Sequence, residues 1–80
     1  MNEVESFWAD ACQLLHEMVE GQHAKLLNCA NRLVPHVTAE DILQPNDFPE
    51  LENHPHFRYE EGVLAGIQSV QMALWALQKR

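Results

Sequence analysis

Residues 59–80 read YEEGVLAGIQSVQMALWALQKR, and this stretch decides the fold because it carries two helical stripes at once. Within each stripe, steps of four and three residues alternate, which is the spacing of one face of an α-helix. The first stripe consists of large apolar residues: Val63, Ile67, Val70, Leu74 and Leu77. The second consists of small residues one position earlier: Gly62, Gly66, Ser69, Ala73 and Ala76. A single neighbouring helix does not easily cover both stripes, so the pattern predicts a helix over residues 57–79 that self-associates or meets a partner.

Another long helix is predicted over residues 4–34, where apolar residues form a broad face rather than a narrow seam. Asn2 is placed to cap its start, and Pro35 forces the preceding residue out of the helical region. The members of the face are Val4, Phe7, Trp8, Ala11, Leu15, Met18, Gln22, Leu26, Cys29 and Leu33. We expect the large stripe of the last helix to meet this face, which leaves the small stripe for a second copy or for the connecting segment.

The connection, residues 35–56, is longer than the loops that usually join two helices. It contains four prolines and no glycine, so its backbone is stiff. Thr38 is a suitable cap for a short helix over residues 39–43, with acidic residues in its first turn. We expect apolar residues along the segment to pack against the long helices. The sequence leaves open whether these helices belong to the same chain or to a neighbouring copy.

These elements predict one all-α domain, residues 1–80: a long antiparallel helical hairpin with an ordered, proline-rich connection that contains a short helix. A domain of 80 residues buries only about 60% of its unfolded surface, so a monomer is marginally stable. The chain is nevertheless 46% hydrophobic. We therefore predict a homodimer, in which two hairpins form a four-helix bundle.

Charge and composition exclude several kinds of partner. The formal net charge is −7, and the five Lys and Arg residues are scattered, so no basic surface for nucleic acid or for an anionic membrane is expected. The apolar run 62–77 is shorter than the roughly 20 residues of a membrane span. The two cysteines match no zinc motif, and the acidic rather than basic start gives no sign of a signal peptide. These features predict a cytoplasmic protein without a cofactor.

One constellation has the spacing of a metal site. His16, Glu20 and His23 share a flank of the first helix, and Glu20 with His23 matches the Glu-x-x-His spacing of di-iron bundles. A homodimer supplies the second motif, and Glu60 or Glu61 would complete the ligands. The alternative interpretation is a solvated polar flank. A bound transition metal therefore stays open as the second hypothesis.

The sequence offers no catalytic site. Neither Ser6 nor Ser69 lies in a G-x-S-x-G turn. Cys12 and His16 are one helical turn apart, but the cysteine belongs to the edge of the core face, where a thiol is inert.

The leading functional hypothesis is therefore a non-enzymatic, self-associating helical protein that binds another protein, as an adaptor or a chaperone does. The alternatives are a metal-binding or di-metal bundle protein and a structural subunit of a larger complex. Two further residues outside both stripes of the last helix, Leu64 and Trp75, join the small stripe as interface candidates. The predicted interface residues are Gly62, Gly66, Ser69, Ala73, Ala76, Leu64 and Trp75.

Overall fold

Helix α1 (Glu3–Leu33) begins and ends where the local sequence requires. The side chain of Asn2 accepts a hydrogen bond of 2.9 Å from the backbone N–H of Glu5, which satisfies a free donor of the first turn. At the other end Val34 adopts an extended conformation before Pro35, as residues preceding proline do. The computed structural model describes residues 2–80, and α1 is the longest element among them.

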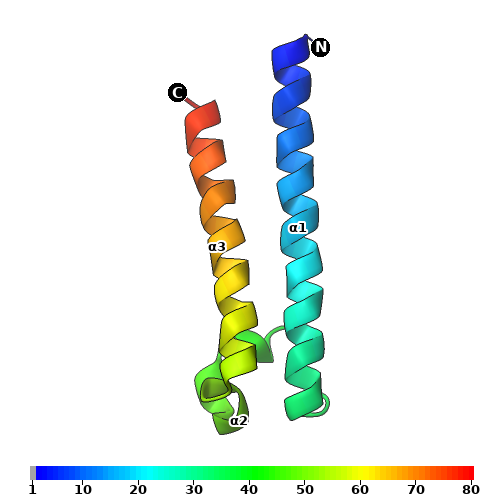
Figure 1. Cartoon of the computed structure of the whole chain (residues 1–80), viewed down its shortest axis with the longest axis vertical. Coiled ribbons are helices and arrows are strands. Elements are labelled where there is room, and N and C mark those ends of the chain that lie inside the picture. Colours follow the sequence, from blue (N-terminus) through cyan, green and yellow to red (C-terminus); the bar gives the residue numbers. More distant parts are fainter. Residues whose placement is uncertain (1) are drawn as a thin grey trace.

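Helix α3 (Pro55–Gln78) runs antiparallel to α1, and the two lie side by side along most of their length (Figure 1). Pro55 occupies the first turn, where a missing N–H costs nothing. Asn53 follows the short helix α2 (Pro49–Glu52), and His54 precedes α3 without a capping side-chain hydrogen bond. The all-helical architecture and the packing of α1 on α3 are confirmed, and no strand occurs between residues 2 and 80.

The connection consists of short helical turns rather than one α-helical segment. A 3-10 helix, η1 (Asp41–Leu43), stands where a short helix over residues 39–43 was predicted, and a second, η2 (Pro45–Asp47), follows at once. Thr38 and Asp41 cap η1 reciprocally: the Asp41 N–H donates to the Thr38 hydroxyl, and the Thr38 N–H donates to the Asp41 carboxylate. Pro45 restricts the residue before it, so η1 ends after one turn.

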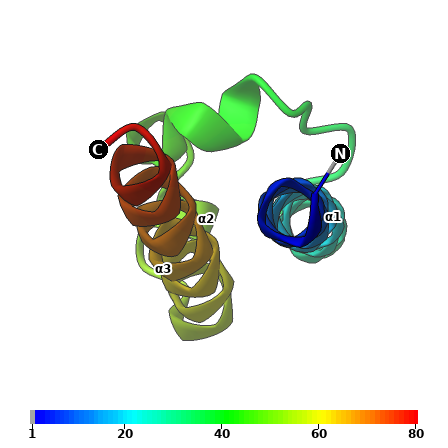
Figure 2. The same cartoon turned by 90° about the horizontal axis from the view of Figure 1, so that it is seen from above.

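Three apolar side chains anchor the connection to its own hairpin. Val37, Ile42 and Leu51 are 6%, 4% and 0% exposed and belong to the same core as residues of α1 and α3. The segment containing η1 passes along one side of the helix pair, which we call the connection side (Figure 2). In this view no such segment lies on the opposite side, which we call the open side. Within one chain the connection therefore packs in cis.

The two long helices meet along a narrow seam that repeats every seven residues, as in a coiled coil. Its residues are buried or half-buried in both helices. On α1 they are Trp8, Cys12, Leu15, Val19, Gln22, Leu26, Cys29 and Leu33; on α3 they are Phe57, Glu60, Leu64, Ile67, Gln71 and Leu74. The Cys12 thiol lies 3.9 Å from the Gln78 side-chain oxygen, which continues the seam toward the free ends.

This seam corrects the expected contact between the helices. Only Ile67 and Leu74 of the large stripe lie in the seam, whereas Val70 and Leu77 are 56% and 50% exposed. Helix α3 is rotated from the predicted orientation because two of its seam positions are occupied by the polar residues Glu60 and Gln71. A pattern of apolar residues does not assign such residues to a contact face. All buried residues of the two long helices lie from Val19 onward in α1 and up to Leu64 in α3, so the core occupies the closed end of the hairpin.

Candidate functional site

The predicted interface residues fall into two groups in the structure. The five small residues Gly62, Gly66, Ser69, Ala73 and Ala76 are all exposed. No atom lies within 4 Å of a Cβ built on Gly62 or Gly66, so neither glycine is needed for packing inside the described chain. Leu64, by contrast, is 7% exposed in the core and offers almost no surface to a partner, whereas Trp75 is 44% exposed. The structure thus leaves the small stripe and Trp75 available for contacts.

The broad apolar face predicted for α1 divides into two stripes. One is the seam to α3. The other covers only the N-terminal part of α1: it starts at Val4, continues one residue before the seam positions Trp8, Cys12, Leu15 and Val19, and is mostly exposed. Its members are Val4, Phe7, Ala11, Leu14 and Met18. Helix α3 carries the corresponding stripe before its own seam: Val63, Gly66, Val70, Ala73 and Leu77. Together these ten residues form what we call the open-side face.

Both halves of this face turn to the same side of the molecule. Residues one position after the seam, such as His23 on α1 and Gln68 on α3, line a pocket together with Ile42 and Leu43. These residues are therefore on the connection side. In an antiparallel pair, the positions one residue before the seam on both helices turn the opposite way. The ten residues consequently share the open side, and no charged residue is among them.

Charge is absent from most of α3. Residues 62–78 contain no Asp, Glu, Lys or Arg, although only one face of this helix is buried. A solvated helix of a soluble hairpin normally has charged residues opposite its buried stripe. On α1 acidic residues remain on the exposed surface beside the apolar stripe, including Asp10 and Glu17. The uncharged surface of α3 therefore resembles an interface more than a solvated face.

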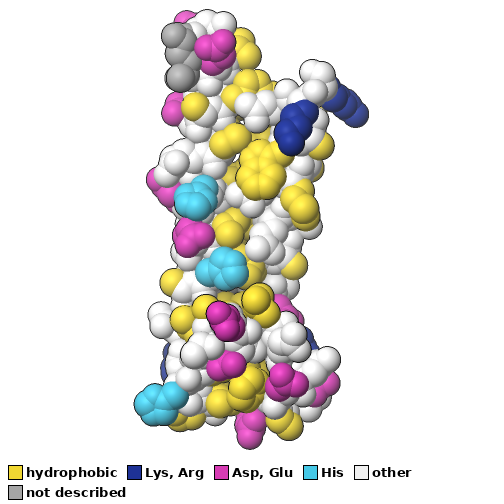
Figure 3. Space-filling model, turned by 180° about the vertical axis from the view of Figure 1, so that it is seen from behind, with side chains coloured by type: hydrophobic (Ala, Val, Ile, Leu, Met, Phe, Trp, Pro, Cys, Tyr) yellow, Lys and Arg dark blue, Asp and Glu magenta, His cyan; other side chains and the backbone are white. Residues whose placement is uncertain are grey.

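The connection side carries the histidines proposed as metal ligands. His16 and Glu20 are exposed and His23 is half-buried, and all three follow the seam by one position. Viewed from behind, hydrophobic side chains gather along the junction of the long helices, and histidine and acidic side chains follow its edge (Figure 3). Within residues 2–80, no group of three or more His, Cys, Asp or Glu side chains is arranged to hold a metal ion.

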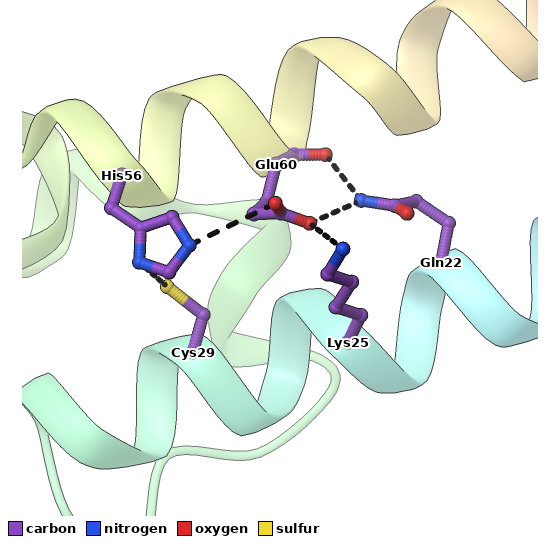
Figure 4. A network of polar contacts seen from close by, with 5 residues as sticks. All are labelled: Gln22, Lys25, Cys29, His56 and Glu60. Atoms are coloured by element: carbon purple, nitrogen blue, oxygen red, sulfur yellow. Dashed lines mark hydrogen bonds and ion pairs between the residues drawn. The ribbon is translucent and has the colours of Figure 1, made fainter.

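The two glutamates proposed as further ligands are engaged elsewhere. Glu61 accepts a hydrogen bond of 2.7 Å from the guanidinium of Arg58. Glu60, a seam residue, belongs to a polar network between α1 and α3 (Figure 4). The metal hypothesis, which requires ligands from a second copy, stays a prediction.

The polar network centres on Glu60, a carboxylate that is only 3% exposed. The side-chain amide of Gln22 donates to its carbonyl oxygen at 3.0 Å and to its Oε2 at 2.7 Å. The Lys25 ammonium lies 3.7 Å from Oε2, and His56 Nε2 lies 3.8 Å from Oε1. These partners compensate the desolvation of a buried charge, which is costly without them. One signal in the sequence points to this network: Gln22 is a polar residue on the otherwise apolar face of α1.

Cys29 extends the network on the side of His56. Its sulfur lies 3.6 Å from His56 Nδ1, so a thiol, an imidazole and a carboxylate follow one another as in a nucleophilic triad (Figure 4). The thiol is 2% exposed. Burial raises its pKa, nearby Arg32 lowers it and Glu60 raises it, with a net increase. An inaccessible thiol is a poor nucleophile, so burial works against a nucleophilic role for Cys29. The contacts of the network link α1 to α3.

The pocket on the connection side is a small, half-open hollow of about 210 Å³. Its floor is formed by Leu26, Ile42 and Leu64, which are almost fully buried. His23 and Gln68 supply polar groups at its rim. The volume is below the range of about 300–1,000 Å³ that is usual for small-molecule sites.

Comparisons with protein-family models, with curated proteins and with solved structures gave no significant match to this chain. No helix within residues 2–80 is both long enough and apolar enough to cross a membrane.

Proposed function

We propose that this protein is a non-enzymatic helical interaction protein that self-associates and, as an assembled bundle, binds another protein in the manner of an adaptor or chaperone. The observation that carries the proposal is the uncharged stretch 62–78 of α3, which the hairpin leaves largely exposed. Exposed apolar surface of this extent costs solubility and marks a contact surface in soluble proteins.

The total surface area supports self-association. A folded monomer of 9.2 kDa exposes about 4,900 Å² by the general scaling of area with mass. This chain exposes 5714 Å² over an elongated shape of 49 × 19 × 18 Å. The excess of about 800 Å² equals the share that each partner contributes to an interface of standard size. A homodimeric four-helix bundle removes that excess without any other component.

The test is sedimentation equilibrium of the purified chain from about 1 to 200 µM. We expect a mass near twice 9.2 kDa at the upper concentrations. A single species of monomer mass across the whole range contradicts the proposal. Binding of another protein is then tested by adding the isolated dimer to unfolding client proteins and measuring suppression of their aggregation by light scattering.

A further inference from the structure

We infer that a second copy of this chain docks on the open-side face, with α1 of each copy against α3 of the other and the two-fold axis parallel to the helices. The inference rests on the proposed self-association and specifies its surface. That surface includes residues of α1, whereas the small stripe lies on α3 alone. It excludes Trp75, which follows the seam by one position and therefore lies on the connection side.

The two halves of the open-side face are complementary in shape. The α1 half of the face presents large, exposed side chains: Phe7, Leu14 and Met18 are 63%, 58% and 44% exposed. The α3 half alternates medium and small residues, with Gly66 and Ala73 on either side of Val70. Large side chains of one helix fit between small ones of the next when the helices pack as knobs into holes. The face is therefore complementary to itself, as an isologous dimer requires.

The register of α1 against α3 also fits this arrangement. The contacts of Cys12 with Gln78 and of Cys29 with His56 fix which residues of α1 and α3 are level with each other. Between these contacts, Leu14 and Met18 are level with the segment of α3 that contains Val70 and Ala73. A two-fold rotation about an axis parallel to the helices leaves the height of every residue along that axis unchanged. It brings α1 of the second copy antiparallel onto α3 of the first, so that every neighbour in the bundle is antiparallel.

The distribution of charge favours contact through the open side. The protein has a formal net charge of −7, so two copies repel each other wherever acidic surfaces meet. The ten residues of the open-side face contain no ionisable group. The connection side, in contrast, presents Glu20 and Glu61 beside the seam. Contact through the open side is the arrangement that buries apolar area without placing those two acidic residues against a second copy.

The test uses two substitutions at positions with nearly equal exposure. Val70 is 56% exposed on the open side, and Met72 is 59% exposed on the connection side. Val70→Glu buries an unpaired charge in each half of the proposed interface, and we expect the dissociation constant to rise about 100-fold or more. Met72→Glu adds the same charge outside the interface, and we expect a change of less than about threefold. Circular dichroism verifies that both variants keep their helix content.

Disulfide trapping tests the pairing of helices directly. In a Cys12→Ser background, a Leu14→Cys copy is mixed with an Ala73→Cys copy and oxidised, and we expect a heterodimeric disulfide. The control replaces Ala73→Cys by Trp75→Cys, for which we expect none.

The outcomes are distinguishable. A wild-type chain that stays monomeric removes the proposed self-association together with this inference. Three results would contradict the open-side interface alone: a dimer that Val70→Glu leaves intact, a dimer that Met72→Glu disrupts equally, or no disulfide between the Leu14→Cys and Ala73→Cys copies.

Discussion

The side-chain amide of Gln22 bridges two oxygens of one residue: it donates to the main-chain carbonyl of Glu60 at 3.0 Å and to its carboxylate at 2.7 Å. The contact ties the middle of α1 to the first turns of α3. A polar pair in the seam between two helices restricts the register, because a shift of either helix leaves a buried carboxylate without its donor.

Replacing Gln22→Leu removes both hydrogen bonds while the carboxylate stays buried. We expect the free energy of unfolding to fall by about 1–3 kcal/mol, the cost of leaving buried polar groups unsatisfied. The double variant Gln22→Leu/Glu60→Leu replaces the pair by apolar side chains, and we expect it to recover most of the loss. Urea unfolding at one fixed protein concentration measures both. A double variant that is less stable than Gln22→Leu contradicts this account.

Cys29 makes stability depend on alkaline pH. The pKa of its thiol is raised in the folded chain, chiefly by burial, whereas in the unfolded chain it ionises near the ordinary value of about 8.5. The folded state therefore holds the proton more tightly. The contribution of the protonated thiol to the free energy of unfolding is fully present below about pH 8.5 and is lost as the pH rises through the folded pKa. Denaturant midpoints from pH 7 to 10.5 measure the decline.

The matched control for this effect is Cys29→Ala compared with Cys12→Ala. The first removes the alkaline decline that belongs to the buried thiol, and the second leaves it in place because Cys12 is only half-buried. Titration with a thiol reagent gives an independent readout: Cys12 reacts first, and Cys29 reacts at the rate at which the hairpin opens. Equal reaction rates for both thiols would contradict the burial of Cys29.

Phe57 is the largest fully buried side chain and lies in the first turn of α3, where the two helices and the connection meet. We expect Phe57→Ala to destabilise the fold by about 3–5 kcal/mol. Met72→Ala, at a side chain that is 59% exposed, is expected to change stability by no more than about 0.5 kcal/mol. Thermal unfolding of both variants at equal concentration measures the difference, and similar values for the two would refute the assignment of the core.

Leu51 holds the connection in place from α2, with none of its side chain exposed. We expect Leu51→Ala to cost about 2–5 kcal/mol and to accelerate proteolysis between residues 35 and 54. Leu43→Ala is the control, because Leu43 belongs to the same segment but is 72% exposed. If the connection docked mainly through its exposed residues, Leu43→Ala would release it as readily as Leu51→Ala.

Periodicity and local signals predicted the helices because the evidence for them is local. Asn2 caps α1 and Pro35 ends it through interactions within a few residues. Thr38 was likewise predicted as the cap of a short helix, and its hydroxyl accepts a hydrogen bond from the Asp41 N–H at the start of the 3-10 turn that follows. Steric and capping effects of this kind act over one turn, so a single sequence contains them.

The orientation of α3 was predicted less well because it depends on partners across the seam. Glu60 is buried next to Gln22 and Lys25. Burial of a carboxylate is unfavourable without such partners, and the sequence pattern of α3 alone does not show that they are there. An apolar pattern assigns such a residue to solvent and rotates the helix accordingly. The same limit applies to Leu64, which lies outside the apolar stripe and nevertheless packs in the core.

The confinement of the core to the closed end also governs how the backbone exchanges hydrogen with water. Amides level with the Cys29–His56 contact lie among buried side chains, so we expect them to exchange only when the whole hairpin unfolds. Amides near Phe7 or Leu77 are held by helical hydrogen bonds alone, beside exposed apolar side chains, and open locally. We therefore expect exchange rates to rise from the closed end of the hairpin toward its free ends. A partner that binds the free ends of α1 and α3 slows exchange there and reduces this difference.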